Sequence, residues 1–260
     1  MSSRSAWRLF AAFSLFSTLL LSVGFYLGVA DILSPSAAGW KTDKSAGEQP
    51  AQPAKNAAQI VALGDSLTRG TGDATGLGYV GNLRKRWAQN TGRDVYVLNH
   101  GVNGYKTADL LRDLQQKEDI RRTIRQADLI TLSIGGNDLF HAGGMEEVNP
   151  EQSRKRLPGA LERYGQIVRI IRSLNPDAPL LYVGLYNAFA DLPNARASYD
   201  VVQRWNGGAT AVLYQYSGTV FIPTDDLFRT RGAAYLSSDR FHPNQDGYRR
   251  IGERMAESIR

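Results

Sequence analysis

Ser66 has a residue type and a local setting that suit nucleophilic catalysis. It stands in the segment Gly-Asp-Ser-Leu-Thr, directly after a short apolar run that predicts a buried strand. A serine at the start of a helix can attack a carbonyl carbon, and the backbone N–H groups that follow it can stabilise the resulting oxyanion. The structural alternative is that Ser66 only caps the N-terminus of that helix.

A candidate general base lies in the segment Asp-Arg-Phe-His-Pro, which we expect at the carboxyl end of the last predicted strand, residues 219–222. Asp239 precedes His242 by three residues, and on a tight loop such a carboxylate can hold the imidazole in one tautomer and orientation. His242 can then take the proton of the Ser66 hydroxyl and return it to the leaving group. Asp and His also occur at this spacing by chance. The pair is therefore evidence for catalysis only in combination with the other segments.

Two glycine-containing segments supply candidate groups for binding an oxyanion. Asn137 lies in Gly-Gly-Asn-Asp after a predicted strand, where its side-chain amide can be aimed at a negatively charged oxygen. Gly104 ends the segment Asn-His-Gly-Val-Asn-Gly, and a glycine lets its backbone N–H approach a ligand closely. Taken singly, each segment is more often an ordinary turn.

The four segments together resemble the SGNH (GDSL) hydrolase family, whose motifs stand here as GDSL, NHGVNG, GGND and DRFH. The resemblance covers residues 59–260. Gly104 is preferred to Gly101 because it ends the Asn-x-x-x-x-Gly pattern. The chain has no Gly-x-Ser-x-Gly segment, which argues against the α/β-hydrolase fold. The resemblance implies the catalytic residues Ser66, Asp239 and His242, and an oxyanion hole formed by Ser66, Gly104 and Asn137.

The residues around these segments predict alternating strands and helices. Strands separated by helices pair in parallel, so we expect a three-layer α/β/α sandwich with a five-stranded parallel sheet. The resemblance implies the same fold, the flavodoxin-like SGNH-hydrolase fold, whose ligand site lies beyond the carboxyl ends of the strands. The predicted strands are 59–63, 94–98, 129–134, 180–185 and 219–222, and the predicted helices are 79–89, 107–114, 119–126, 151–174, 194–216 and 245–259.

Composition excludes several kinds of chemistry. The 260 residues contain no cysteine, so the chain has no disulfide, thiol nucleophile or Cys-ligated zinc. Only three histidines are present, which argues against a His-rich metal centre, and we expect neither a metal nor an organic cofactor. The net charge of +6 accompanies no nucleic-acid-binding motif, so we expect no nucleic-acid partner. The oligomeric state is not predicted.

The N-terminal part of the chain has the pattern of an export segment. Residues Leu9 to Ala30 run for 22 positions without a charge, behind Arg4 and Arg8. This pattern predicts a transmembrane anchor or signal peptide over residues 1–33, with the bulk of the chain outside the cytoplasm. The Pro-, Ala- and Ser-rich composition that follows predicts a flexible linker over residues 34–58. The resemblance implies an SGNH hydrolase domain over residues 59–260. The enzyme would be membrane-anchored through this helix, or secreted if the segment is cleaved.

The sequence therefore predicts an extracytoplasmic serine hydrolase that cleaves acyl esters through an acyl-enzyme on Ser66, with lipase-, lysophospholipase- or thioesterase-like activity. One alternative is a carbohydrate esterase that deacetylates wall or extracellular polysaccharide. An alternative of another class is a non-catalytic module that binds wall or membrane. Residues 140–150 and 188–194 are the expected pocket loops. Four aromatic residues could line an acyl pocket or belong to the core: Phe140, Tyr186, Phe189 and Phe241.

Overall fold

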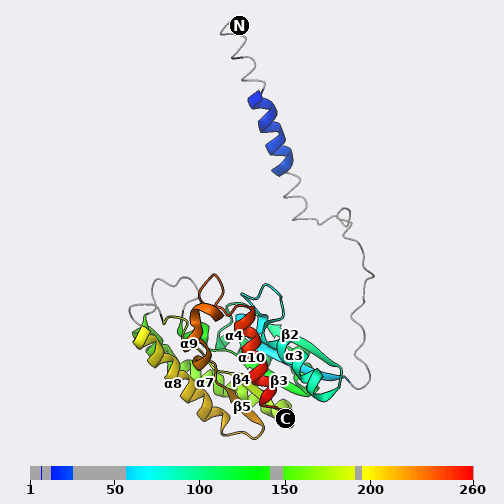
Figure 1. Ribbon diagram of the computed structural model, residues 1–260, viewed down its shortest axis with the longest axis vertical. Helices are drawn as coiled ribbons and strands as arrows, with labels where there is room; N and C mark the ends of the chain where they lie inside the picture. The colour runs from blue at the N-terminus through cyan, green and yellow to red at the C-terminus, as the bar shows by residue number, and fades with distance from the viewer. Residues whose placement is uncertain (1–6, 8–12, 26–56, 141–148, 191–194, 260) are drawn as a thin grey trace. The chain divides into compact units, whose positions relative to one another are not determined.

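The computed structural model describes residue 7 and residues 13–25, 57–140, 149–190 and 195–259 of the chain (Figure 1). The chain divides into two units, Met1–Ala51 and Gln52–Arg260. In the first unit, residues 13–25 form a helix whose large apolar side chains are exposed. No helix among the described residues is long and apolar enough to cross a membrane. Of the anchor or signal segment predicted over residues 1–33, the structure describes residue 7 and residues 13–25. The rest of that segment and most of the predicted linker lie outside the described residues.

The second unit alternates strands and helices along its described residues. The strands are β1 (Ala58–Gly64), β2 (Val95–Gly101), β3 (Leu129–Ser133), β4 (Leu180–Val183) and β5 (Thr219–Ile222). The helices are α2 (Ser66–Arg69), α3 (Gly78–Thr91), α4 (Thr107–Gln116), α5 (Glu118–Arg125), α6 (Gly136–Leu139), α7 (Pro150–Leu174), α8 (Ala195–Leu213), α9 (Asp225–Tyr235) and α10 (Gln245–Glu257).

The strands form one parallel sheet in the order β2-β1-β3-β4-β5. At the carboxyl end of β1, Gly64 lies opposite Gly101 of β2 on one side and opposite Ser133 of β3 on the other. The carboxyl ends of these three strands are therefore side by side. This arrangement confirms the predicted five-stranded parallel sheet, and it brings the segments that follow β1, β2 and β3 to one edge.

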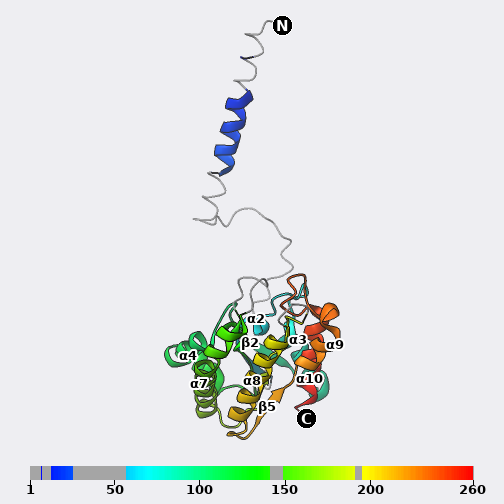
Figure 2. The ribbon, with the colours of Figure 1, turned by 90° about the vertical axis from the view of Figure 1, so that its left-hand side faces the viewer.

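Helices cover both faces of the sheet because its central strands are apolar on both sides. In β1, Val61 and Leu63 pack into one buried cluster, with residues of α4, α5, α7 and α8. Ile60 and Ala62 point to the other face and pack with residues of α3, α9 and α10. Figure 2 shows α4 and α7 on one side of the unit and α3, α9 and α10 on the other. The three-layer α/β/α sandwich is confirmed.

The connections after β1 and β3 leave the sheet toward opposite faces. β1 is followed by α3, which covers one face, whereas β3 is followed by α7, which covers the other. In open parallel sheets a ligand crevice forms where neighbouring strands send their connections in opposite directions. The expected position of the site is therefore between the ends of β1 and β3, where Ser66 and Asn137 lie.

Among the described helices of this unit, α6 and α9 were not predicted from the sequence, and α2 was expected only as a helix that begins near Ser66, with no end given. Helices α2 and α6 are four residues long each, too short to show a helical period. Helix α9 has 11 residues, but its backbone is non-helical at Arg231, and no strong apolar stripe marks it. The predicted strands and the longer helices all occur, with ends that differ from the expected ones by a few residues.

Candidate active site

Ser66 is held by an abrupt passage from strand β1 into helix α2. Gly64 ends the strand with a φ of 143°, and a Cβ there would lie 2.0 Å from the Ser133 carbonyl oxygen, so only glycine fits. Asp65 is the N-cap of α2, where its Oδ1 accepts a hydrogen bond from the Leu67 N–H at 3.0 Å. The capping alternative for Ser66 is therefore wrong, because Asp65 performs that role and the Ser66 hydroxyl makes another contact.

A hydrogen-bonded relay joins Ser66, His242 and Asp239. The Ser66 Oγ lies 2.8 Å from His242 Nε2. On the other side of the ring, His242 Nδ1 lies 2.6 Å from Asp239 Oδ2. Because an ionised carboxylate only accepts hydrogen bonds, Nδ1 carries the ring proton and Nε2 is left to accept from the serine hydroxyl. The structure thus brings the three predicted catalytic residues together in the order of a nucleophile, a base and an orienting acid.

Asp239 stays charged although it touches the imidazole. Its side chain is 44% exposed. Burial acts to raise the pKa of Asp239, but hydrogen bonds outweigh that effect and lower the pKa to about 2. The donors are the His242 ring, the backbone N–H groups of Phe241 and His242, and the Ser237 hydroxyl. Asp239 is therefore ionised throughout the neutral pH range.

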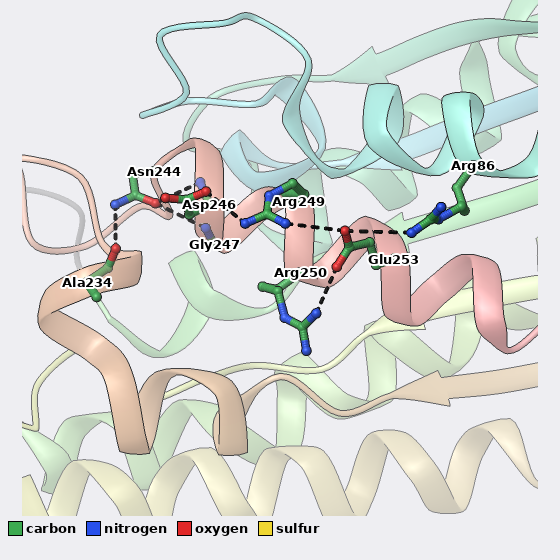
Figure 3. Close-up of polar contacts among 8 residues, drawn as sticks. All are labelled: Arg86, Ala234, Asn244, Asp246, Gly247, Arg249, Arg250 and Glu253. Carbon is green, nitrogen blue, oxygen red and sulfur yellow. Dashed lines mark hydrogen bonds and ion pairs between the residues drawn. The ribbon is translucent and has the colours of Figure 1, made fainter.

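The loop that carries this pair is anchored at the start of helix α10. Asn244 follows His242 by two residues and caps α10, with its Oδ1 accepting from the N–H groups of Asp246 and Gly247 at 3.0 Å each. The Nδ2 of Asn244 donates to the Ala234 carbonyl at 2.8 Å, as Figure 3 shows. One side chain therefore ties the end of α9 to the start of α10 and fixes the histidine end of the loop.

The expectation that this loop follows the fifth strand directly is wrong. Helix α9 (Asp225–Tyr235) lies between β5 and the loop. The loop still reaches Ser66 because α9 packs in the same apolar cluster as α10, through Phe228 and Tyr235. The chain therefore returns to the carboxyl edge of the sheet after an additional helix.

Asn137 is positioned by the turn that follows β3. Gly135 has a φ of 116°, and a Cβ there would lie 2.1 Å from the Trp205 indole, so glycine is required by both conformation and packing. The Nδ2 of Asn137 donates to the Tyr105 carbonyl at 3.0 Å. Since a carbonyl oxygen only accepts, this contact fixes which way the amide faces. The second amide hydrogen remains available for another acceptor.

Gly104 lies in the loop after β2, immediately before Tyr105. It is exposed, its φ is 78°, and nothing lies within 4 Å of the position that a Cβ would take. Gly101 differs, because it is buried at the end of β2 and a Cβ there would lie 2.5 Å from the Arg69 backbone nitrogen. Gly101 therefore serves close packing against α2, whereas Gly104 adjoins the residue that holds Asn137. The oxyanion role of Gly104 stays a prediction.

A buried polar network behind the nucleophile was not predicted from the sequence. The Ser133 hydroxyl donates to Asp65 Oδ1 at 2.7 Å and lies 2.8 Å from Thr68 Oγ1. Thr68 Oγ1 in turn lies 2.7 Å from the Tyr79 hydroxyl. Burial raises the pKa of Asp65 to about 6. The only signal in the sequence is the presence of polar residues at strand ends, and the pairing of β1 with β3 is needed to join them.

An apolar pocket opens beside Ser66. Its cavity volume is about 30 Å³. The rings of Phe140 and Phe189 pack at 4.9 Å between centroids, and the Tyr186 hydroxyl donates to the Phe241 carbonyl at 2.6 Å. All four aromatic candidates therefore lie at the pocket, although parts of the two expected pocket loops lie outside the described residues. The lining residues are Asp65, Ser66, Leu67, Gly136, Asn137, Phe140, Leu185, Tyr186, Ala188, Phe189 and Phe241.

The other histidines lie apart from this relay or outside the described residues. His100 is on β2, and its Nε2 lies 3.2 Å from the Thr123 hydroxyl. Burial lowers the pKa of His100. His141 lies outside the described residues. Among the residues that the structure describes, no group of three or more His, Asp or Glu side chains could hold a metal ion.

A three-layer sandwich in which a serine at a strand end is hydrogen-bonded to a histidine, and the histidine to an aspartate, on a surface loop has the arrangement of a hydrolase. The sequence matches the GDSL-like lipase/acylhydrolase family over residues 62–250, and the chain belongs to that family. It is 34% identical over 224 residues to the uncharacterized protein YpmR of Bacillus subtilis, with 83% of this chain and 88% of the relative covered. It is 27% identical over 206 residues to the spore germination lipase LipC of Bacillus licheniformis, with 76% and 94% covered.

Solved structures share the fold. A lipase from a goat rumen metagenome, Lip_vut3, superimposes with a TM-score of 0.70 at 24% identity, covering 78% of this chain and 97% of that one. An acetylxylan esterase of Geobacillus stearothermophilus, Axe2, gives a TM-score of 0.60 at 16% identity, covering 79% and 96%. At these identities the likeness establishes the fold alone. The family membership supports an enzyme that hydrolyses ester bonds.

Proposed function

We propose that this chain is a serine esterase in which Ser66 takes up the acyl group of a carboxylic ester or thioester. The observation that carries the proposal is the relay from Ser66 through His242 to Asp239, with contacts of 2.8 Å and 2.6 Å. A nucleophile within hydrogen-bond distance of its base is the geometric requirement for this chemistry. The apolar pocket beside Ser66 offers an acyl chain a place to lie.

In the first half of the reaction, the Ser66 Oγ attacks the carbonyl carbon while its proton passes to His242 Nε2. The electron pair of the carbonyl moves to its oxygen and gives a tetrahedral intermediate. Ionised Asp239 stabilises the imidazolium without taking its proton. The intermediate collapses, the bond to the alcohol or thiol breaks, and the leaving group takes the proton from Nε2.

In the second half, a water molecule gives its proton to His242 Nε2 and attacks the acyl-enzyme. The second tetrahedral intermediate collapses and breaks the bond to the Ser66 Oγ, which recovers the proton from the histidine. The carboxylic acid product leaves. The free amide hydrogen of Asn137 and the backbone N–H groups of Ser66 and Gly104 are the proposed donors to the oxyanion in both halves.

An acyl ester of the kind that a lipase or lysophospholipase cleaves is the first proposed substrate class. It is supported by the aromatic pocket walls, which include Phe140, Phe189 and Phe241, and by the relationship to a germination lipase. The small cavity of about 30 Å³ favours a second candidate, the removal of acetyl groups from polysaccharide. The shared fold with an acetylxylan esterase is compatible with this second candidate.

A chain-length series separates the two substrates. The full chain is assayed on p-nitrophenyl esters from acetate to decanoate and on acetylated xylan. The first candidate predicts a maximum of kcat/KM at butyrate or longer and no release of acetate from xylan. Activity confined to the acetate esters would overturn the lipase-like proposal in favour of the deacetylase.

Labelling with a fluorophosphonate probe tests the serine mechanism itself. The probe should react with the wild-type chain and not with Ser66→Ala, because only an activated serine attacks the phosphorus atom. A folded wild-type chain that takes up no probe and hydrolyses no ester would instead support a non-catalytic binding module.

The proposed site of action is outside the cytoplasm. The support is the uncharged segment from Leu9 to Ala30 behind Arg4 and Arg8, a pattern typical of export segments. A protease added to intact expressing cells should degrade the unit Gln52–Arg260. Protection of that unit until the cells are lysed would contradict the proposal.

A further inference from the structure

Two loops that follow the strands on either side of β1 are joined to each other beside Asn137. The Asn137 amide donates to the Tyr105 carbonyl at 3.0 Å. The next residue, Asp138, accepts two hydrogen bonds from Thr107, one from its N–H at 2.8 Å and one from its hydroxyl at 2.6 Å. Three hydrogen bonds at consecutive positions therefore connect the loop after β2 to the turn after β3.

Arg163 of helix α7 binds both partners of this connection, Thr107 and Asp138. Its Nε donates to Thr107 Oγ1 at 2.9 Å, and its terminal nitrogen contacts Asp138 Oδ1 at 3.2 Å. The Thr107 hydroxyl gives its one hydrogen to Asp138, so it can only accept from Arg163. The Asp138 side chain is 3% exposed, and a carboxylate so deeply buried requires a cationic partner.

We propose that Arg163, Thr107 and Asp138 form a brace that positions the Asn137 amide in the oxyanion hole, an inference that rests on the proposed function above. Among the described residues, the carbonyl of Tyr105 is the hydrogen-bond partner of this amide. The residues on either side of Tyr105, Gly104 and Lys106, are exposed. Tyr105 itself packs against the buried cluster and its hydroxyl donates to Asp113 Oδ2 at 2.8 Å, so the brace is the second attachment of this loop and the one that reaches Asn137 through Asp138.

The brace therefore acts through geometry. A donor stabilises an oxyanion only when it is already placed where the charge develops, and a displacement of about 1 Å costs on the order of a hundredfold in rate. The brace residues touch neither the substrate nor the reacting atoms. They are positioning residues, and their loss should weaken binding of the tetrahedral intermediate more than binding of the substrate.

The first test is Arg163→Met, which keeps most of the side chain's apolar stem and removes both hydrogen bonds. We expect kcat for p-nitrophenyl butyrate to fall about tenfold, with KM changed less than about twofold. Affinity for an alkyl boronic acid, whose adduct with Ser66 is tetrahedral, should fall in parallel with kcat/KM. The matched control is Arg169→Met, on the exposed side of the same helix, which should match the wild type in all three measurements.

A second pair of variants serves if Arg163→Met does not fold. Thr107→Val has nearly the same shape but loses the hydroxyl, whereas Thr107→Ser keeps the hydroxyl and loses only the methyl group. Thr107→Val should reproduce the loss of kcat, and Thr107→Ser should restore most of it. Equal activities of the two variants would overturn the role of the hydroxyl.

A double-mutant cycle decides whether the brace works through Asn137. In an Asn137→Ala background, Arg163→Met should lower kcat by less than about twofold, because the amide that it positions is gone. Losses that simply multiply would overturn the proposal and indicate a general structural effect. Failure of the underlying function is recognised separately, since wild-type and Ser66→Ala chains would then hydrolyse esters equally.

Discussion

Ser66 and Asn137 lie at the ends of two buried neighbouring strands, whereas His242 and Asp239 lie on a loop between two helices at the surface. The strand side depends on close approach, since Gly64 and Gly135 leave no room for a Cβ. The loop side depends on local hydrogen bonds. The nucleophile therefore belongs to the buried core of the domain, whereas the base lies on a surface loop that packs against that core.

Two carboxylates beside the site show the consequence of this difference. Burial raises the pKa of Asp65, on the strand side, to about 6. On the loop side, the hydrogen bonds of Asp239 outweigh its burial and lower its pKa to about 2. Their surroundings therefore shift the pKa values of these two aspartates in opposite directions. Changes on the strand side should affect stability as well as chemistry, and changes on the loop side should affect mainly chemistry.

The largest expected effect is that of Ser66→Ala on the strand side. Loss of the nucleophile should lower kcat for p-nitrophenyl butyrate by about 10⁴- to 10⁶-fold, since the remaining groups cannot form an acyl-enzyme. The control is Ser173→Ala, which removes the hydroxyl of an exposed serine on α7 and should leave kcat unchanged. A Ser66→Ala chain that keeps a tenth of the wild-type rate would show that Ser66 is not the nucleophile.

Asp239→Asn is expected to give the next largest effect, on the loop side. The amide can still accept hydrogen bonds from the backbone, but it carries no charge to stabilise the imidazolium. We expect kcat to fall about 10²- to 10⁴-fold at neutral pH. The urea unfolding midpoint should change little, because the side chain is 44% exposed.

The control for this variant is Asp226→Asn. Asp226 is exposed to a similar degree and is paired with Arg254 at 2.6 Å, away from the catalytic relay. Its replacement should leave kcat at the wild-type value. If both variants lowered kcat equally, a general electrostatic effect would replace the specific role of Asp239.

Asp65→Asn tests the strand side through the pH dependence of stability. The pKa of Asp65 is raised from 3.8 to about 6, so the folded chain holds this proton more tightly than the unfolded chain. This tighter proton binding adds to the free energy of unfolding. The added stability is fully present well below pH 4 and is lost as the pH rises through about 6, a total change of about 3 kcal/mol. Urea unfolding at pH 4 and pH 7 should therefore show the variant gaining roughly 2 kcal/mol relative to the wild type, because at pH 4 the unfolded chain is already partly ionised at this residue.

Asp239→Asn supplies the opposite sign as a comparison. The lowered pKa of Asp239 contributes stability that is present above about pH 4 and is lost as the pH falls through about 2. The contribution is small because solvent screens this half-exposed group. For Asp65→Asn, the contradicting result is a difference in the free energy of unfolding from the wild type that stays constant from pH 4 to pH 7. Such a result would show that burial does not raise the pKa of Asp65.

The smallest expected effect is a change of acyl preference in Phe189→Leu. Phe189 is 4% exposed and lines the pocket, and the smaller side chain leaves room for a longer acyl chain. The ratio of kcat/KM for octanoate to that for butyrate should rise about tenfold. Phe228→Leu is the control, because Phe228 is equally buried and lies outside the pocket lining. The same shift in both variants would mean that loosened packing, and not the pocket wall, changes the preference.

Much of the fold was predictable because its signals are local. The apolar run at residues 59–63 indicates a buried strand, and it forms β1 over Ala58–Gly64. The alternation of strands and helices is sufficient to indicate a parallel sheet. Helix α9 was not predicted because no strong apolar stripe marks it and its backbone is non-helical at Arg231. The predicted place of the Asp239 loop relative to β5 was wrong for that reason. The order of the strands is not encoded in any local pattern.

The site divides in the same way. The sequence by itself determined which residues could act together locally, since Asp239 and His242 are three positions apart and meet at 2.6 Å within one loop. Only the tertiary structure decided that His242 meets Ser66, 176 positions away. It alone joined Asp65 to Ser133, and Arg163 to the loop beside Asn137. The physical reason is that such contacts depend on strand order and register, which bring distant segments to one edge of the sheet, whereas sequence patterns report neighbours along the chain.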